Sequence, residues 1–444
     1  MYKTVYKTGT SFKEKLLSGI VWRAINVFAA FVFNALLVRQ IGATATGSFF
    51  YLLNNLFFAV LLLSMGIESG ISFYNARKEI SVSFLFSVGI IWSIAASIIF
   101  FIIIHLFDEQ LLQLKHGYVF LTLYVFGSML NSFLSAIYFT NHNSKAPNLT
   151  ATLTNIILIL LLPGMPWING SLDFESYVLI YLAAALLSPL VLAFKLLQNK
   201  FVFSFSVFKT DSVKPLLLFS FHSFIIGLLF NLLKRSDYWL VNKWCSVTEA
   251  GNYFQASKVM QLLLLLPALA SFSLYPLIVQ SIKKDENSSE QTQTSTKVTK
   301  LIGMYFFIAV LLGLAITVFG YWVFPLLYGT TFSNLYLTTL FLIPGLIFFA
   351  ATYPLTVFFS GKNQNMITII FLSISIAVLV VCNIILTPKY YIYGASISNS
   401  LANFVFFILL LRRFLSQNKL SFKISHFTNA LNGKEIFKSL VNLK

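Results

Sequence analysis

Charge and cysteine are both scarce in this sequence. Only 10% of its 444 residues are charged, whereas 58% are hydrophobic, and the mean hydropathy is +0.82. Such a composition lies outside the range of soluble globular domains. Cys245 and Cys382 are the only cysteines, and no CxxC or Cys/His cluster surrounds them, which excludes a disulfide framework and a structural metal. We therefore expect an all-α polytopic membrane protein.

Acidic residues are the scarcer of the two charge types. There are 14 Asp and Glu against 31 Lys and Arg, a net charge of +17. In a membrane protein an excess of basic residues usually arises from the cytoplasmic loops that retain them, rather than from nucleic-acid binding. We therefore expect no nucleic-acid partner. The sequence also lacks a serine nucleophile elbow, a metal-ligand cluster and a Gly-rich phosphate loop. It predicts no enzyme, no catalytic residue, no metal and no cofactor.

Long apolar runs dominate what is present. A helix needs ~20 residues to cross the ~30 Å hydrocarbon core. By that measure the chain holds twelve expected crossings, separated by Gly, Pro, Asn or charged residues. Their ranges are 18–40, 46–68, 81–106, 117–140, 148–168, 175–198, 214–241, 248–279, 300–325, 333–360, 365–387 and 392–414.

The distribution of basic residues predicts the orientation. Cytoplasmic loops retain Lys and Arg, and placing both termini inside puts 23 basic residues in the tails and alternate loops on that side. The opposite side holds Lys115, Lys243 and Lys389, with Arg39 at its boundary. We therefore expect a multi-pass protein with both termini in the cytoplasm.

Six plus six crossings indicate two lobes with an internal repeat. Segment 38–61 aligns with 242–265 at an offset of 204, and 139–143 aligns with 359–363 at an offset of 220. Each half has an even number of crossings, so the copies are parallel repeats about an axis along the membrane normal.

This repeat divides the chain into four expected regions. They are an N-terminal lobe at 1–200, a cytoplasmic connection at 201–213, a C-terminal lobe at 214–415 and a basic cytoplasmic tail at 416–444. The tail is expected to form a surface helix on anionic lipid. The polar segment 283–300 is expected to be a solvated loop.

Polar residues form a stripe along the first expected crossing. Arg23, Asn26, Ala30 and Asn34 follow steps of three, four and four, which places them on one helix face. A charge at membrane depth costs roughly 2.5 to 3.5 kcal/mol on insertion scales, so it usually faces a bundle interior or water. The stripe is expected to face the space between the lobes.

The seventh and eighth crossings carry matching polar faces. Asn231 and Lys234 lie on one stripe of the seventh, with Arg235 one step aside. Gln255 and Lys258 are spaced by three on the eighth. The candidate site residues in the C-terminal lobe are therefore mostly cations and amides.

The chain resembles the polysaccharide flippases of the O-antigen transporter (Wzx) type, within the multidrug/oligosaccharidyl-lipid/polysaccharide (MOP) exporter superfamily. The residues that carry the resemblance are NALLVRQIGATATGSFFYL, MGIESGISFY, KRSDYWLVNKWCSVTEAGNYFQASKV and LTPKYYIYGASISNSLANF, in order over the span 14–414. The family often has Arg followed by Asp in the seventh helix, where this chain has Lys234-Arg235-Ser236-Asp237.

The resemblance implies a two-lobed, V-shaped bundle like that of the multidrug (MATE) exporters. It also implies alternating access that moves a polyprenyl-pyrophosphate-linked oligosaccharide from the inner to the outer leaflet of the bacterial cytoplasmic membrane. The product would serve surface polysaccharide assembly: O-antigen, capsule or exopolysaccharide. The implied partners are the lipid-linked oligosaccharide, membrane lipids, and the polysaccharide polymerase and chain-length machinery.

The cations have expected roles with such a substrate. A pyrophosphate diester carries about two negative charges, and cations lining a hydrated cavity can replace its water. Arg23 is expected to meet the headgroup on entry, Lys258 to hold it midway, and Lys234 with Arg235 to receive it near the outer end.

Amides and carboxylates complete the expected site. Asn26, Asn34 and Gln255 suit sugar hydroxyls. Asp237 is expected to pair with Lys234, three residues away. Glu68 and Asp237 are the candidates for gating or for coupling, with H⁺ or Na⁺ as the coupling ion.

Three alternatives remain at this point. The first is a cation-coupled multidrug exporter of the same superfamily, which would use Glu68 and Asp237 as its buried carboxylates. A sugar transporter of the major facilitator type lacks support because no Gly-Arg-rich turn follows the second crossing. A polymerase or ligase acting on the same lipid would need large outer loops, whereas the outer loops here are short.

Overall fold

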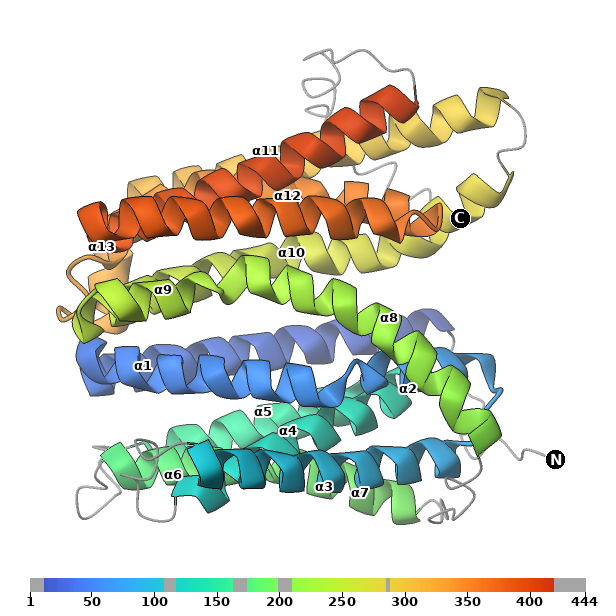
Figure 1. The fold of residues 1–444 in the computed structure, drawn as a ribbon, viewed down its shortest axis with the longest axis horizontal. Coiled ribbons are helices and arrows are strands. Elements are labelled where there is room, and N and C mark those ends of the chain that lie inside the picture. Colours follow the sequence, from blue (N-terminus) through green and yellow to red (C-terminus); the bar gives the residue numbers. More distant parts are fainter. Residues whose placement is uncertain (1–11, 108–116, 163–173, 199–209, 285–287, 419–444) are drawn as a thin grey trace. The chain divides into compact units, whose positions relative to one another are not determined.

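The computed structural model describes residues 12–107, 117–162, 174–198, 210–284 and 288–418, and every regular element in these residues is a helix (Figure 1). The helices are α1 (Phe12–Ser64), α2 (Ile67–Arg77), α3 (Val82–Phe107), α4 (Gly117–Thr140), α5 (Lys145–Leu160), α6 (Phe174–Ala184), α7 (Leu187–Gln198), α8 (Thr210–Arg235), α9 (Asp237–Trp244), α10 (Val247–Lys284), α11 (Ser288–Tyr328), α12 (Leu335–Gly361) and α13 (Asn365–Gln417). Most of the connection 201–213 and of the tail 416–444 lies outside the described residues.

Eight helical stretches in the described part of the chain are long and apolar enough to cross a membrane. Two of them each contain two expected crossings, because α1 has a non-helical residue at Gly42 (φ 74°, ψ 176°) and α13 has one at Tyr391 (φ 51°, ψ −135°). The 16 residues of α5 are fewer than the ~17 of the shortest usual crossing. The chain is an all-helical multi-pass membrane protein, but the expected crossings do not each form a separate helix.

Two of the expected crossings each consist of two helices with a break between them. The sixth is divided into α6 and α7, and the seventh into α8 and α9 at Ser236. Pro189 explains the first break, because it has no N–H to donate to the carbonyl of Ala185 four residues earlier, and its ring would collide with that carbonyl. Glu175–Gln198 and Val213–Trp244 each remain long and apolar enough to cross a membrane, so the expected crossings over 175–198 and 214–241 are confirmed, and only the break inside each was not expected.

The expected loop at 283–300 was also wrong. Residues 288–300 form the first turns of α11, which continues to Tyr328. At 1.5 Å per residue its 41 residues span roughly 60 Å, about twice the hydrocarbon thickness. The polar residues therefore extend the helix beyond the membrane instead of ending it.

The chain divides into two compact units. Unit 1 consists of Met1–Ile41 and Leu52–Leu228, and unit 2 consists of Gly42–Tyr51 and Leu229–Lys444. The short segment 42–51 therefore belongs with the C-terminal helices, and the first part of α8 belongs with the N-terminal ones.

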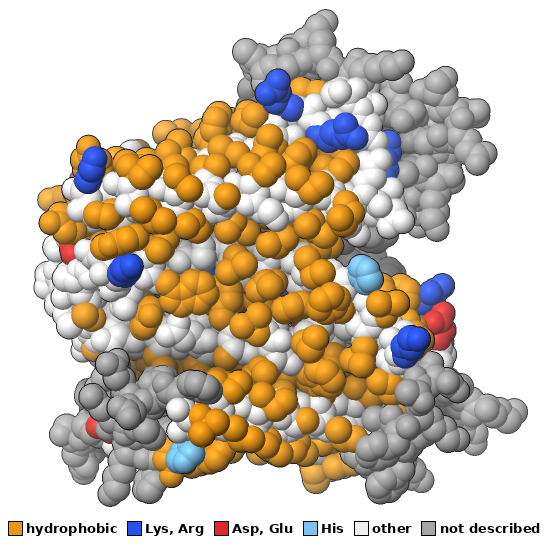
Figure 2. Space-filling view, viewed as in Figure 1, with side chains coloured by type: hydrophobic (Ala, Val, Ile, Leu, Met, Phe, Trp, Pro, Cys, Tyr) orange, Lys and Arg blue, Asp and Glu red, His pale blue; other side chains and the backbone are white. Residues whose placement is uncertain are grey.

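On the face shown in Figure 2, apolar side chains cover much of the described surface, and Lys and Arg are few. In unit 1, Ile98 of α3 is 55% exposed, and in unit 2, Trp322 and Leu326 of α11 are 66% and 69% exposed. Contiguous exposed apolar surface is costly in water. These faces are suited to contact with lipid.

A close helix crossing lies inside unit 2, where residues 42–51 meet the first turns of α10. A Cβ atom added to Gly47 would lie 3.1 Å from the backbone nitrogen of Gly251, and one added to Gly251 would lie 3.1 Å from that of Gly47. Each would also collide with a carbonyl oxygen, that of Val247 or of Ala43 respectively. Small residues permit such backbone approach in membrane helices.

The crossing relates equivalent positions of the two aligned segments. The hydroxyl oxygens of Thr44 and Thr248 are 2.8 Å apart and share a hydrogen bond. The Thr pair and the Gly pair are both separated by 204 residues, the offset at which segments 38–61 and 242–265 align. Each segment therefore offers the same small surface to the other.

Candidate functional site

Three cations of α8 and α10 lie near one another in unit 2. Lys234 and Arg235 occupy the last turn of α8, and Lys258 lies in the fourth turn of α10. All three side chains are half-buried. The guanidinium of Arg235 acts electrostatically on both lysines. The structure therefore brings together the three C-terminal-lobe cations that the sequence analysis selected.

Aromatic rings and an amide hold these cations. The ammonium of Lys258 lies 3.3 Å from the centroid of the Phe50 ring, and that of Lys234 lies 5.1 Å from the centroid of Phe349. Arg235 Nη2 donates a hydrogen bond of 3.0 Å to Gln261 Oε1. Cation–π contacts offset part of the desolvation of a buried ammonium and leave its charge in place.

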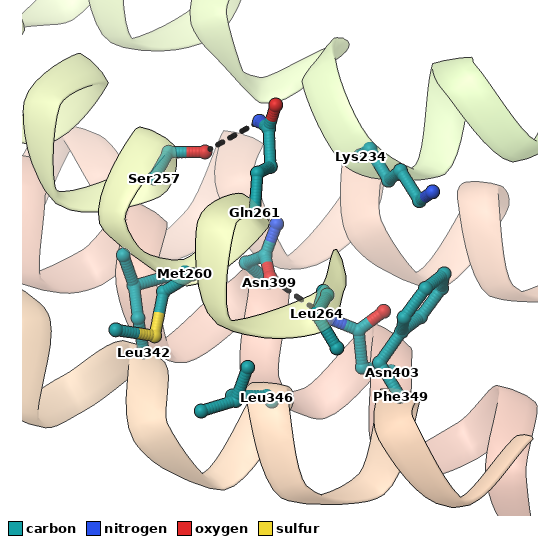
Figure 3. Close-up of a pocket in the computed structure, with 11 residues that line it drawn as sticks. Lys234, Ser257, Met260, Gln261, Leu264, Leu342, Leu346, Phe349, Asn399 and Asn403 are labelled. Carbon is teal, nitrogen blue, oxygen red and sulfur yellow. Dashed lines mark hydrogen bonds between the residues drawn. The ribbon is translucent and has the colours of Figure 1, made fainter. Parts of the chain in front are cut away.

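A small pocket opens beside Lys234 (Figure 3). Its volume is about 40 Å³, the space of about one water molecule in the liquid. Polar groups reach it from three helices: Lys234 from α8, Ser257 and Gln261 from α10, and Asn399 and Asn403 from α13. No acidic side chain is among the described residues that line it. The wall thus combines one cation with hydrogen-bonding amides.

Asp237 lies behind this pocket and is fully buried. Its Oδ2 accepts hydrogen bonds from the hydroxyl of Tyr253 and from Asn399 Nδ2, the latter at 2.8 Å. Asn403 Nδ2 in turn donates to Asn399 Oδ1 at 2.8 Å. The carboxyl group is therefore connected to the pocket wall by a chain of amides.

The expected pairing of Asp237 with Lys234 was wrong. The helix break at Ser236 makes Asp237 the first residue of α9, so the two side chains no longer follow one helical stripe. Asp237 bonds with Tyr253 and Asn399 instead. Its second oxygen, Oδ1, is buried without a hydrogen-bond partner among the described residues.

The remaining C-terminal-lobe candidates lie at different depths. Asn231 is half-buried in α8, one turn before Lys234 and Arg235. Gln255 is fully buried, and its side chain is hydrogen-bonded with the hydroxyl of Tyr328. Gln255 therefore packs against α11 and is not among the residues that line the pocket.

Four predicted site residues belong to unit 1. Arg23 is exposed on α1, whereas Asn26 and Asn34 on the same helix are half-buried. Asn26 Oδ1 is buried without a hydrogen-bond partner in the described part of the chain. Glu68 lies in the first turn of α2 and is half-buried, with Oε2 likewise unpartnered.

Sequence reasoning missed the amides and rings that complete the site. Asn399 and Asn403 stand one helical turn apart in an otherwise apolar segment, a spacing that places them on one face. That spacing was a usable signal for a polar wall. Nothing in the sequence indicated that Phe349 would lie beneath Lys234, since 115 positions separate them in the chain.

Neither metal nor thiol chemistry is organised in the described residues. They contain no group of three or more His, Cys, Asp or Glu side chains that could hold a metal ion. Cys245 follows α9, and burial, with a smaller contribution from the charge of Glu249, raises the pKa of its thiol to about 12. A thiol of this kind stays protonated and unreactive at neutral pH.

Comparison with known proteins identifies the family. A model of the family described as "Polysaccharide biosynthesis protein" matches residues 13–282, more than half of the chain. The chain belongs to this family. A search of curated proteins gave no match.

Solved structures show the fold of this family member. An inward-facing multidrug resistance MATE transporter of the MOP superfamily is 13% identical, with a TM-score of 0.72 and coverage of 90% of this chain and 98% of that one. The lipid II flippase MurJ, in an inward closed conformation, is 15% identical, with a TM-score of 0.66 and coverage of 97% and 92%. A MOP transporter from Pyrococcus furiosus is 16% identical, with a TM-score of 0.62 and coverage of 92% and 97%. The family member therefore has the fold of these MOP proteins, as the sequence resemblance implied.

Proposed function

We propose that this transporter moves a polyprenyl-pyrophosphate-linked oligosaccharide from the inner to the outer leaflet of the bacterial cytoplasmic membrane. In this proposal the chain crosses the membrane twelve times in two six-helix lobes, with both termini in the cytoplasm, and works by alternating access. The product is delivered for O-antigen, capsule or exopolysaccharide assembly by a polymerase and its chain-length machinery. The family match and the MOP fold support a transporter for a lipid-linked substrate.

The cluster of Lys234, Arg235 and Lys258 is the observation that carries the proposal. Each cation at membrane depth costs roughly 2.5 to 3.5 kcal/mol, and three of them near one another also repel. An anion that enters the site offsets both costs. A pyrophosphate, with about two negative charges and several acceptor oxygens, matches a site of one guanidinium, two ammonium groups and neighbouring amides.

Asp237 and Glu68 are proposed to couple transport to an ion gradient. Asp237 is buried, retains one unpartnered oxygen, and connects through Asn399 and Asn403 to the pocket that Lys234 lines. Binding of H⁺ or Na⁺ at that oxygen would change the charge behind the pocket wall. Glu68 offers a second buried oxygen, in unit 1.

Depletion of the protein in its host tests the function. We expect the lipid-linked oligosaccharide, measured by mass spectrometry, to accumulate in the inner leaflet, where an impermeant glycosidase cannot reach it. No accumulation, together with increased sensitivity to cationic drugs, would instead indicate a multidrug exporter, the alternative within the same superfamily.

A matched pair of variants tests the site. Lys258→Gln removes a cation of the cluster, whereas Lys297→Gln removes an exposed cation on α11. At equal membrane expression, only Lys258→Gln should reduce export. Equal export by the two variants would rule out the cation cluster as the phosphate site.

A further inference from the structure

A second pocket lies wholly within unit 1, among α4, α5 and the α6–α7 pair. Its volume is about 210 Å³, the space of about seven water molecules in the liquid, or of one monosaccharide unit. It is lined by Tyr124, Ser128, Asn131, Ala151, Thr154, Asn155, Leu158, Tyr181, Ala184, Ala185 and Ser188. None of the candidate residues from the sequence analysis is among them.

The pocket exists because the sixth expected crossing is broken at its middle. Pro189 cannot donate to the carbonyl of Ala185, and the chain turns at Ala185 and Leu186 through bonds that reach back three residues instead of four. Gly127 lets α4 approach this turn, since a Cβ atom there would lie 2.6 Å from the carbonyl oxygen of Ala185. Irregular backbone at membrane depth is tolerated only where it is buried in protein or lines a water-filled cavity.

The lining is polar but uncharged. Ser188 Oγ donates to Asn131 Oδ1 at 2.8 Å, and Ser188 Oγ also lies 2.8 Å from the hydroxyl of Thr150, which fixes these groups at the break. Thr154 bonds to the carbonyl of Thr150 at 3.1 Å. Asn155 also lines the pocket and makes no hydrogen bond to any other described residue. The pocket therefore keeps an amide available to an occupant.

Two aromatic rings add a flat wall. The rings of Tyr124 and Tyr181 are inclined by 24°, with centroids 6.3 Å apart, and Tyr181 also stacks on Phe33 at 6.0 Å and 10°. These two contacts restrict the Tyr181 ring. A rigid aromatic face beside hydroxyl and amide groups suits a ring that is apolar on its faces and polar at its edges.

We propose that this pocket binds one uncharged sugar ring, and that it acts as a glycan subsite distinct from the cation cluster of unit 2. The inference rests on the proposed function, because the ring would belong to the transported oligosaccharide. An ionic group would find no counter-charge among the lining residues. An acyl chain would leave the amide of Asn155 without a hydrogen-bond partner.

Site-specific photo-crosslinking tests the subsite and does not require that the glycan be identified beforehand. p-Benzoylphenylalanine replaces Ala151, which lines the pocket, or Leu153, which is on the same helix and 49% exposed. After irradiation of whole cells, the purified full-length protein is digested and its peptides are fragmented in a mass spectrometer. We expect carbohydrate oxonium ions from the peptide substituted at position 151 and none from the peptide substituted at 153.

A second pair of variants relates the pocket to transport. Asn155→Leu removes the available amide, whereas Ile156→Leu changes a 42% exposed neighbour. We expect Asn155→Leu to lower export by at least about fivefold at equal expression and Ile156→Leu to leave it unchanged.

The outcomes separate the two proposals. If depletion of the protein traps lipid-linked oligosaccharide inside but position 151 yields no carbohydrate adduct and Asn155→Leu exports normally, the sugar subsite is refuted and the flippase proposal stands. A lipid adduct at position 151 would also refute the sugar subsite. If depletion has no effect on the oligosaccharide, the proposed function itself fails.

Discussion

Replacement of Gly251 by alanine tests the helix crossing in unit 2 on which the position of Lys258 depends. The added Cβ atom would collide with the carbonyl oxygen of Ala43 and lie 3.1 Å from the backbone nitrogen of Gly47. Both obstacles are backbone atoms, so no side-chain rotation can relieve the overlap, and α10 must move away from segment 42–51. That movement also breaks the 2.8 Å hydrogen bond between Thr44 and Thr248.

The magnitude follows from these two effects. Insertion of an extra methyl group into a close-packed contact costs about 1–3 kcal/mol, and loss of the hydrogen bond adds about 0.5–1.5 kcal/mol. We expect a destabilisation of about 1.5–4.5 kcal/mol in total. Since Lys258 is held over Phe50 of the same segment, transport should also fall.

Thermal unfolding of the purified protein in one detergent measures the effect, with Gly227→Ala as the matched control. A Cβ atom on Gly227, inside α8, would meet no atom within 4 Å. Alanine has the higher helix propensity, by about 1 kcal/mol, so Gly227→Ala should raise the unfolding temperature while Gly251→Ala lowers it. Equal or higher stability of Gly251→Ala would refute the close crossing.

Three further predictions concern the site and the crossing. Lys258→Gln should lower export about tenfold or more, as expected for loss of a charge-assisted hydrogen bond, whereas Lys258→Arg should retain part of the export activity. Full export by Lys258→Gln in an inverted-vesicle assay would contradict the role of Lys258. Asp237→Asn, which keeps the size of the side chain but removes its charge, should make transport insensitive to collapse of the proton and sodium gradients by ionophores; an unaltered response to both ionophores would eliminate Asp237 as the coupling group. The double variant Thr44→Cys/Thr248→Cys should form a disulfide on oxidation, detected as a mass loss of about two hydrogens. The control double variant Thr46→Cys/Thr248→Cys should form none. Disulfide formation in both variants would show that the helix crossing is not fixed as described.

Much of the fold was predictable because membrane insertion depends on local composition. Runs of apolar residues near twenty in length identify membrane helices whatever their neighbours are. The same argument fails where a helix is broken inside such a run. Hydropathy does not reveal the helix breaks at Pro189 and Ser236, because a broken helix and a continuous one can contain the same apolar residues.

The candidate site was predictable in part. The positions of Lys234, Arg235 and Lys258 on α8 and α10 follow from helical spacing, and the structure brings the three together. The pairing of Asp237 was not predictable, because it depends on the direction that α9 takes after Ser236. The unit 1 pocket was missed for a related reason: it contains no charge, and its uncharged polar residues come from separate helices.

The sequence by itself determined that this chain is an all-helical membrane protein of a polysaccharide biosynthesis family. Composition, apolar run length and scattered family motifs are properties of residues close together in the chain. Only the tertiary structure decided which distant side chains meet: Asp237 with Asn399, Lys258 with Phe50, and Gly47 with Gly251. The physical reason is that a break in a helix, or a close approach of two helices, sets the direction of every residue that follows. Which distant side chains come into contact therefore depends on positions far from them in the chain.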